Sequence, residues 1–494
     1  MYDNLFNNKK LTRNSGFFSF KLFTFKSRYY LCMVNKRVDL TAAQIEHLKS
    51  LVTGQVSTNE TVLDQHGKDE SAIPPVRPSA VVMPQSTEEV SKVLAYCNAE
   101  KIPVVAFGAG SSLEGHVLPL FGGISLDLTQ MNKVVEVRGD DLLVRVQPGV
   151  HRKALNEKLA NSGLFFSVDP GADATLGGMA ATGAAGTTTV RYGSMRDNVL
   201  ALTAVLADGT VIKTGRETRK LSAGYDLTRL LVGSEGTLAI ITELTLKVFG
   251  IPEKMAAAIV RFNNLSDGVT AATAIVRSGI SIARCEFLDA KCIKNVNAHD
   301  GLSLLEVPTL FFEFHGSPQG VAEDAASVKA IVEEFGGSDF EWATDEGARR
   351  KLWQARHNAY WAGIAANPGR RAVSTDAAVP LSKLAQAVTV AEEILSKHPY
   401  PFSILGHVAD ANFHCFIVTN PAKPNELEDV RHITHEITMK MIEMGGTCTG
   451  EHGIGSGKIQ ALEAETGAPA VSIMRSIKKT LDPNNILNPG KVFN

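Results

Sequence analysis

The apolar positions of the first hundred residues predict a helix followed by a βαβ unit. Apolar side chains recur at helical spacing over residues 40–52, which predicts a short amphipathic helix. The proline-dense stretch 73–78 predicts an extended linker. Beyond it we expect a strand at 80–83, a helix with acidic residues in its first turn at 86–96, and a strand at 103–107.

The pattern then changes to short alternating strands. We expect these strands, with one helix between them, at residues 124–127, 142–146, 151–160 (the helix), 199–206 and 237–248. From about residue 255 to 345, helices such as 268–278 alternate with strands such as 309–314, which indicates a separate α+β domain. The chain is therefore divided into residues 1–39, a helical segment at 40–73, a first domain at 74–252 and a second at 253–494.

Residues 1–39 form a leader of unusual composition or a mis-assigned start. Six lysines and arginines lie before Met33, and Asp3 is the one acidic residue among them. The segment fits a mitochondrial transit peptide. Alternatively, Met33 is the true start, and the protein is then a bacterial cytoplasmic one, with a position at the membrane surface left open.

Composition narrows the classes of function. A chain of 494 residues is long enough for two or three domains. Its formal net charge of -2 provides no basic surface for nucleic acid. The six cysteines form no CxxC pair, which argues against a disulfide framework and a zinc ribbon. No apolar run approaches the roughly 20 residues that cross a bilayer, so no transmembrane segment is expected. A small-molecule function remains.

Three segments rich in small residues indicate a large ligand. They are FGAGSSLEG at 107–115, DPGADATLGGMAATGAAG at 169–186 and GSEGTLAII at 233–241. Small side chains allow backbone N–H groups to approach a diphosphate closely. The first segment alone is often a tight turn, but the second is a long run of tiny side chains that would weaken a packed core unless a large ligand lies against it. Close helix packing through small faces stays open as the alternative for the second segment.

A histidine hairpin and a Glu-His pair suggest a metal site. If residues 409–412 form a turn, His407 faces His414 across two antiparallel strands. Glu451 and His452 lie in a glycine-rich loop, GEHGIG. Two imidazoles and a carboxylate leave open positions on a divalent ion, as a catalytic site requires. The alternative, two hydrogen-bonded histidines and an unrelated glycine turn, stays open on the residues alone.

The order of these segments, together with YGSMRDNV at 192–199, resembles the p-cresol methylhydroxylase and vanillyl-alcohol oxidase flavoproteins, and among them the FAD-linked D-lactate dehydrogenases. The resemblance covers residues 40–494 and implies an α+β fold: a two-part FAD-binding domain of the vanillyl-alcohol oxidase type and a C-terminal α+β substrate domain with an antiparallel sheet. The FAD contacts that it implies are Gly108, Ala109, Gly110, Ser111, Ser112, Gly115, Pro170, Asp173, Thr175, Gly178, Thr182, Asn198, Glu235, Ile240 and Asn488. Ser111 stands where tethered relatives carry histidine, so non-covalent FAD is expected, although His116 keeps a tether open.

The same resemblance assigns the chemistry of the second domain. It implies that His407, His414 and Glu451 bind a divalent metal, zinc or manganese, that His452 is the base and that Arg356 binds the substrate carboxylate. An arginine suits that task because its planar fork donates two parallel hydrogen bonds. Alanines at 409 and 411 replace the glycines of the usual turn, at a cost of about 1 kcal/mol wherever φ is positive.

The expected activity is FAD-dependent, metal-assisted oxidation of D-lactate or a similar small D-2-hydroxy acid to the 2-oxo acid, with electrons passed to cytochrome c or a quinone. Glycolate and D-2-hydroxyglutarate are alternative substrates, because their reacting ends are alike. Two other classes stay open: a flavoprotein electron-carrier subunit without its own substrate, and a metal-binding structural protein without flavin. A homodimer is also left open.

Overall fold

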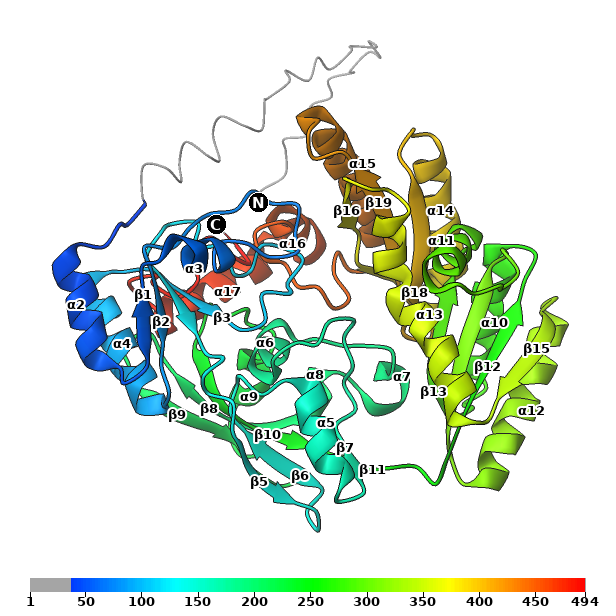
Figure 1. The fold of residues 1–494 in the computed structure, drawn as a ribbon, viewed down its shortest axis with the longest axis horizontal. Coiled ribbons are helices and arrows are strands. Elements are labelled where there is room, and N and C mark those ends of the chain that lie inside the picture. Colours follow the sequence, from blue (N-terminus) through cyan, green and yellow to red (C-terminus); the bar gives the residue numbers. More distant parts are fainter. Residues whose placement is uncertain (1–36, 494) are drawn as a thin grey trace, which may run out of the picture.

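The chain forms three large sheets, and the first of them lies in the N-terminal half (Figure 1). A computed structural model describes residues 37–493, so the predictions for residues 1–36 lie outside it. The sheet has the order β1-β2-β4-β3, with β1 antiparallel and the others parallel. Its strands are β1 (Gln55–Ser57), β2 (Ala80–Met83), β3 (Val104–Phe107) and β4 (Ile124–Asp127), and its helices are α2 (Ala42–Leu51), α3 (Glu60–Gln65) and α4 (Thr87–Glu100).

The expected βαβ unit is present as β2-α4-β3, and the expected first helix as α2. Thr41 caps α2 by a capping box with Gln44, and Ser86 caps α4. The segment 40–73 is not separate from the βαβ unit, however. Its strand β1 pairs with β2, and Leu48 of α2 belongs to the core beneath this sheet. The proline stretch therefore joins two parts of one unit.

The second sheet is antiparallel, with the order β5-β6-β10-β8-β9. Its strands are β5 (Val134–Arg138), β6 (Leu143–Val146), β8 (Val199–Val205), β9 (Val211–Gly215) and β10 (Ile240–Lys247). The helices α5 (Arg152–Ala160), α6 (Leu176–Thr182), α7 (Thr189–Tyr192), α8 (Met195–Asn198) and α9 (Leu227–Leu231) accompany it, with the two-stranded pair β7 (Leu164–Phe165) and β11 (Phe249–Gly250). The sequence patterns missed β5 and β9, which are the two edge strands and in which Thr214 is the one buried residue.

The third sheet is antiparallel, as expected for the C-terminal domain. Its order is β15-β12-β14-β13-β18-β19-β16, with β17 also on β19. The strands are β12 (Lys254–Arg261), β13 (Ile282–Leu288), β14 (Thr309–Gly316), β15 (Ser338–Ala343), β16 (Arg371–Ser374), β17 (Ala377–Ala378), β18 (Phe402–His407) and β19 (Asn412–Thr419).

Helices cover both faces of the third sheet, and each face has its own apolar core. Phe312 and Phe314 face one layer while Phe311, the residue before Phe312, faces the other, as the alternation along a strand requires. The helices are α10 (Leu265–Arg277), α11 (Ala290–Asp300), α12 (Pro318–Glu334), α13 (Glu346–Ala365), α14 (Leu384–Ser396) and α15 (Pro424–Glu443), with 3-10 turns η1 (Leu381–Lys383) and η2 (Val408–Asp410).

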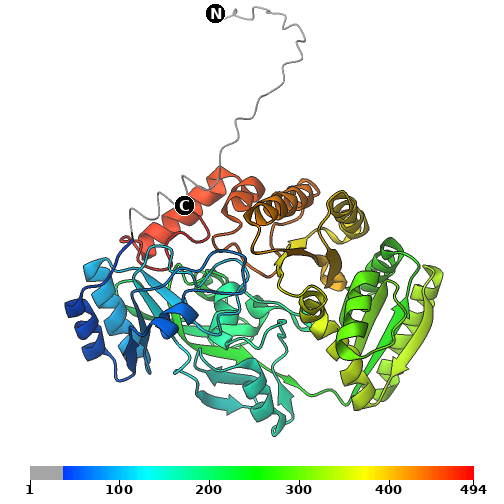
Figure 2. The ribbon, with the colours of Figure 1, turned by 45° about the horizontal axis from the view of Figure 1, so that its top comes forward.

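The C-terminal end returns to the N-terminal half (Figure 2). Helices α16 (Ile459–Thr466) and α17 (Ala468–Leu481) lie beside that half in both views. Beyond them, Val104 of β3 donates its N–H to Ile486 O at 2.8 Å, and Asn488 donates its N–H to Val104 O at 2.8 Å. The end of the chain therefore extends the edge of the first sheet.

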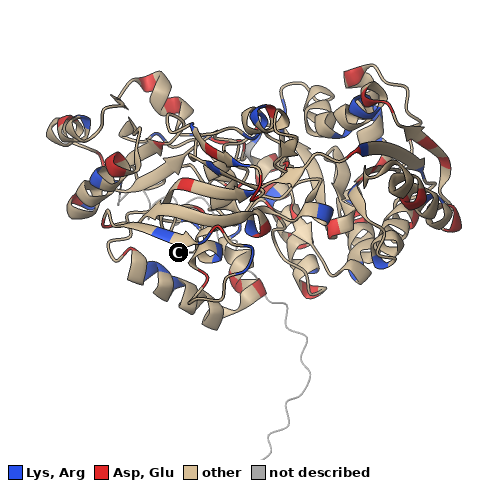
Figure 3. Ribbon diagram, turned by 90° about the horizontal axis from the view of Figure 1, so that it is seen from below, with Lys and Arg blue, Asp and Glu red and all other residues tan. Residues whose placement is uncertain are grey.

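Charges are interspersed over both halves of the ribbon, with no face of one sign in the view from below (Figure 3). This agrees with the small net charge. Within residues 37–493, no helix combines the length and the apolar character needed to span a bilayer.

Candidate active site

A cavity of about 460 Å³ lies where the N-terminal half meets the third sheet, and this volume is typical of ligand sites. The glycine-rich segments line one side. The other side is formed by residues of α13, β18 and β19 and by the Glu451-His452 loop. The two sets of residues singled out from the sequence therefore share one cavity.

The loop after β3 forms a glycine-rich cradle, the glycine cradle, at the wall of the cavity. Gly110 has φ +67, which favours glycine. Among the described residues, the backbone N–H groups of residues 109–113 donate to no recorded partner, although these residues line the cavity. A row of free N–H groups beside a cavity fits the oxygens of a diphosphate.

Most of the residues expected to contact FAD line the cavity: Gly108, Ala109, Gly110, Ser111, Ser112, Pro170, Thr175, Gly178, Thr182, Glu235, Ile240 and Asn488. Three do not line it. Gly115 packs against Ile73 and Ser456. Asp173 is near His151, with 3.6 Å between Oδ2 and Nδ1. The Asn198 amide donates to the carbonyls of residues 192–194, so these three residues shape the surrounding loops.

The histidine hairpin forms with a register that differs from the prediction. His407 is paired with Asn412, and His414 with Leu405. The reason is the tight turn η2, which is closed by Ala411 at φ +53 in the left-handed region. A register change of two residues leaves the side chains on the same face. The two imidazole rings therefore still meet, with centroids 5.4 Å apart.

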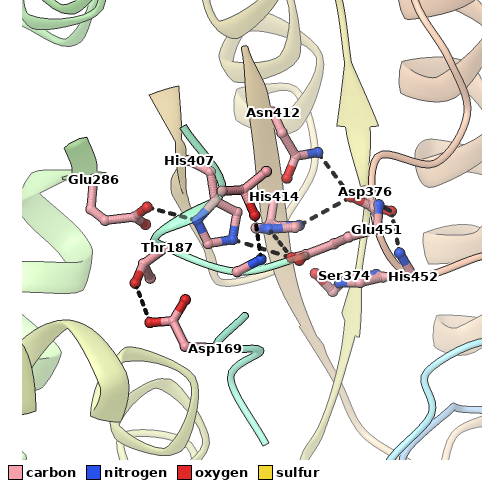
Figure 4. Close-up of polar contacts among 12 residues, drawn as sticks. Asp169, Thr187, Glu286, Ser374, Asp376, His407, Asn412, His414, Glu451 and His452 are labelled. Atoms are coloured by element: carbon pink, nitrogen blue, oxygen red, sulfur yellow. Dashed lines mark hydrogen bonds and ion pairs between the residues drawn. The ribbon is translucent and has the colours of Figure 1, made fainter. Parts of the chain in front are cut away.

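Both imidazoles point their Nε2 atoms at one carboxylate oxygen (Figure 4). Glu451 Oε1 lies 3.2 Å from His407 Nε2 and 3.3 Å from His414 Nε2. On the far side of the rings, Nδ1 of His407 donates to Glu286 at 2.7 Å, and Nδ1 of His414 donates to Thr375 O at 3.1 Å. A neutral imidazole that donates from Nδ1 has a lone pair on Nε2. Two lone pairs facing a carboxylate need a proton or a cation between them.

The pKa shifts of His407 and Glu451 also favour positive charge between the two histidines and the carboxylate. Burial opposes charge on His407, but the carboxylates of Glu286 and Glu451 outweigh it and raise the pKa of His407 well above its usual range. Burial likewise opposes ionisation of Glu451, yet the two histidines hold its pKa well below its usual range. The cluster stabilises positive charge between its nitrogens and its carboxylate.

His452 lies beside this cluster in a different environment. Its ring stacks on that of His414, with 5.0 Å between centroids and 7° between planes. In the described structure Nδ1 of His452 is buried without a hydrogen-bond partner. Burial lowers the pKa of His452 to about 4. A neutral imidazole in a cavity wall can accept a proton.

Asp376, which the sequence did not single out, fixes the loop that carries Glu451 and His452. Its Oδ2 accepts hydrogen bonds from the backbone N–H groups of both residues, at 2.9 and 2.7 Å, and from Thr449 Oγ1 at 2.7 Å. Burial acts against ionisation, but His452 and Lys458 hold the pKa of Asp376 well below its usual range. Asp376 lies in the two-residue break between β16 and β17, which both pair with β19, so no sequence pattern marked it.

Arg356 of α13 lines the cavity, held by Glu286 of β13. Lys458, which follows the Glu451-His452 loop, lies 2.9 Å from Glu114 and does not line the cavity. The sequence also missed an apolar wall at this end, formed by Tyr360, Trp361, Leu405 and Phe416.

Known protein families and solved structures share the fold of this chain. Residues 78–215 match the family described as FAD binding domain, and residues 251–492 match FAD linked oxidases, C-terminal domain. The solved structure of p-cresol methylhydroxylase with substrate bound is similar, with a TM-score of 0.75 at 17% identity over 92% of this chain and 97% of that chain. The chain is an FAD-binding flavoprotein with this fold, as predicted.

Two relatives are similar over most of their length. A probable D-lactate dehydrogenase, mitochondrial, of Danio rerio is 46% identical over 472 residues, which are 94% of this chain and 95% of the relative. The mitochondrial D-lactate dehydrogenase [cytochrome] of Arabidopsis thaliana is 42% identical, over 91% of this chain and 80% of the relative. The chain belongs to the D-lactate dehydrogenase family of FAD-linked oxidases.

Proposed function

We propose that this protein oxidises D-lactate, or a similar small D-2-hydroxy acid, to the 2-oxo acid. The observation that carries the proposal is the convergence of Arg356, the His407-His414-Glu451 cluster and His452 at one end of a cavity whose other end is the glycine cradle. This supplies a carboxylate-binding group and a base opposite the cofactor. The family's D-lactate dehydrogenases support the choice of substrate.

The glycine cradle and the small-residue walls fit FAD. Residues 108–112 would hold the pyrophosphate through their backbone, and Pro170, Thr175, Gly178 and Ile240 would lie against the rest of the cofactor. Gly171 and Gly236 have no atom within 3.5 Å of the point where a Cβ would stand, so the walls leave room for a large ring system. FAD supplies the hydride acceptor. Because Ser111 occupies the tether position, we infer that FAD is bound without a covalent bond.

The histidine cluster fits a divalent metal. His407, His414 and Glu451 would be the ligands, and the acceptors behind the two Nδ1 atoms would fix both rings, as the outer partners of metal-binding histidines do. The nitrogen and carboxylate donors suit zinc or manganese. Such an ion supplies Lewis acidity toward a substrate oxygen.

Arg356 and His452 then act on different groups of the substrate. Arg356 binds the carboxylate and orients the molecule, because Glu286 holds its guanidinium in place. The imidazole of His452 takes the proton of the C2 hydroxyl, since its low pKa keeps it neutral and able to accept. Burial of the site keeps water from competing for these groups.

The cavity favours a small monocarboxylate. Within the described residues, Arg356 is the one lysine or arginine in the lining, while Tyr360, Leu405 and Phe416 offer an apolar surface. A methyl group such as that of lactate suits this surface. The second carboxylate of 2-hydroxyglutarate would lie in the cavity without a second fixed cation, at the cost of an unpaired buried charge.

We further propose that a cytochrome receives the electrons and that the protein is mitochondrial. Both follow from the relative in Arabidopsis, which is named a cytochrome-linked and mitochondrial enzyme.

The test is anaerobic mixing of the purified yellow protein with a panel of D- and L-2-hydroxy acids while flavin absorbance is followed. We expect D-lactate to bleach the flavin, L-lactate to leave it oxidised and D-2-hydroxyglutarate to react poorly. Absorbance unchanged by every acid would indicate an electron-carrier subunit instead.

A further inference from the structure

Glu235 links the FAD-binding half to the catalytic loop. It follows α9, has φ +56 and is almost fully buried. Its carboxylate binds the loop of residues 449–455, to which Asp376 also binds. Oε1 accepts the N–H of Ile454, and Oε2 accepts that of Gly455, both at 2.7 Å. These partners lie about 220 positions away in the sequence, so only the folded molecule brings them together.

The backbone of Glu235 is itself fixed to the FAD-binding half. Its N–H donates to Ala181 O at 2.8 Å, and its carbonyl accepts from Asn488 Nδ2 at 2.7 Å. His116, a further lining residue, places Nε2 3.1 Å from Oε2 of the same carboxylate. Burial opposes its ionisation, but His116 and the two backbone donors lower the pKa of Glu235. The carboxylate is therefore rigidly mounted and ionised.

Two carboxylates therefore bind the loop of residues 449–455, Glu235 from the FAD-binding half and Asp376 from the C-terminal half. Asp376 binds the N–H groups of Glu451 and His452. Glu235 binds those of Ile454 and Gly455. Charged acceptors make hydrogen bonds that are shorter and stronger than neutral ones. Loss of Glu235 leaves two buried N–H donors without a partner, and loss of Asp376 leaves two partly buried ones, which costs free energy.

We propose that Glu235 is a positioning residue: it sets the distance and angle at which the metal ligand Glu451 and the base His452 face the flavin side of the cavity. Gly453 supports this role. At φ +82, a Cβ added there would lie 2.7 Å from Glu235 Oε1 and 2.7 Å from His116 Nε2. The loop can approach the carboxylate this closely only with glycine at that position.

The first test is Glu235→Gln studied by hydrogen–deuterium exchange in the FAD-loaded protein. The amide keeps the size of the side chain but turns one acceptor into a donor that faces a backbone N–H. We expect the amides of residues 449–458 to exchange roughly 10- to 100-fold faster, which corresponds to the loss of a hydrogen bond to a charged group. Flavin reduction by D-lactate should slow at unchanged FAD content, with kcat falling more than KM rises.

Glu89→Gln is the matched control. Glu89 is also buried and accepts the backbone N–H groups of Thr53 and Gln85, at 3.0 and 2.8 Å, but it does not line the cavity. Its variant should exchange faster near residues 53 and 85 and leave residues 449–458 unchanged. Exchange in 449–458 that is equal in the wild type and in Glu235→Gln overturns the proposal.

A second variant covers the case in which Glu235→Gln fails to fold. Gly453→Ala pushes the carboxylate away without removing it, and it should reproduce the fast exchange of residues 449–458 while FAD stays bound. Normal exchange in that variant would show that the contact does not position the loop. The kinetic expectation rests on the proposed function, whereas the exchange expectation does not. A protein inactive on D-lactate, but with fast exchange in these variants, would contradict the function and keep the role of Glu235.

Discussion

Arg356 and Glu286 form a buried ion pair, with Nη2 2.6 Å and Nε 2.8 Å from Oε2 of the carboxylate. The other oxygen of Glu286 accepts a hydrogen bond from His407 Nδ1 at 2.7 Å. One carboxylate therefore orients both the arginine that we propose binds the substrate and a histidine that we propose binds a metal. Both contacts of Arg356 use the Nε and Nη2 side of the guanidinium, so its Nη1 end is the part available to a ligand.

Arg356→Lys should weaken substrate binding. Lysine keeps the charge but lacks the planar fork that can bind Glu286 and a carboxylate together. We expect kcat/KM for D-lactate to fall by about 10- to 100-fold, the loss of one hydrogen bond to a charged group, while FAD content stays normal. Steady-state kinetics and flavin absorbance measure both. The control is Arg349→Lys on the same helix, which contacts Glu313 at 3.2 Å and does not line the cavity. An unaltered kcat/KM for Arg356→Lys would assign the carboxylate to another cation.

Replacement of His407 and His452 separates the metal from the base. His407→Ala removes a proposed ligand, so metal content and activity should fall together while the flavin spectrum is unchanged. His452→Ala should retain the metal but slow anaerobic flavin reduction by about 10²- to 10⁴-fold, the usual contribution of a general base. Elemental analysis and stopped-flow absorbance on the two proteins measure the difference.

A buried histidine outside the cavity provides the control for both variants. His315 contacts Glu313 at 2.8 Å and is absent from the cavity lining, so His315→Ala should keep metal and rapid reduction. Full metal occupancy in His407→Ala would remove it from the ligand set. Rapid reduction in His452→Ala would remove it as the base.

The local patterns of the sequence predicted much of the fold. The apolar spacing over residues 40–52 predicted α2, and the acidic first turn of the segment 86–96 predicted α4, because these signals lie within the helix itself. The hairpin was predicted on the correct face, because alternation fixes the face of a strand but not its pairing. The pairing depended on the left-handed backbone of Ala411, and an alanine in the sequence does not indicate a positive φ.

The support of the site could not be predicted in the same way. Asp376 and Glu286 were not singled out from the sequence, and Glu235 was expected to contact FAD rather than the loop of residues 449–455. All three act on partners distant in the sequence, and the partners of Asp376 and Glu235 are mostly backbone N–H groups, which are the same for every residue type except proline. An isolated acidic residue in a chain is most often solvated. Only the fold shows that these three are buried and bonded.

Denaturation tests whether FAD is bound to the protein without a covalent bond. Ser111 cannot form the tether of histidine-linked relatives, so acid or heat should release yellow FAD into the supernatant. Absorbance of the supernatant and pellet after centrifugation measures the distribution. Flavin that stays with the pellet would identify a covalent bond, and His116→Ala would then show whether this lining residue forms it, since the released fraction should rise in that variant.

Glu313 should make stability depend on pH in the acid range. This buried side chain of β14 contacts His315 at 2.8 Å, Arg349 at 3.2 Å and Arg284 at 3.5 Å, and Arg284 also pairs with Asp169 of the FAD-binding half at 3.0 Å. Burial acts to raise the pKa of Glu313, but its cationic partners outweigh burial and lower the pKa to about 2. In the unfolded chain a glutamate titrates near ~4.3.

Because the folded pKa is the lower one, the ionised Glu313 stabilises the protein above about pH 4.3, and this contribution is lost as the pH falls toward about 2. A shift of roughly two pKa units corresponds to about 3 kcal/mol at most. The free energy of unfolding of Glu313→Gln should therefore lie well below that of the wild type at pH 6, and the two should converge as the pH falls below about 4. Urea unfolding at a series of pH values measures the difference. Glu333→Gln, which alters an exposed carboxylate paired with Lys329, should show little difference at any pH. A gap between Glu313→Gln and the wild type that stays constant from pH 6 to about pH 3 would show that the carboxylate stabilises by its shape rather than by its charge.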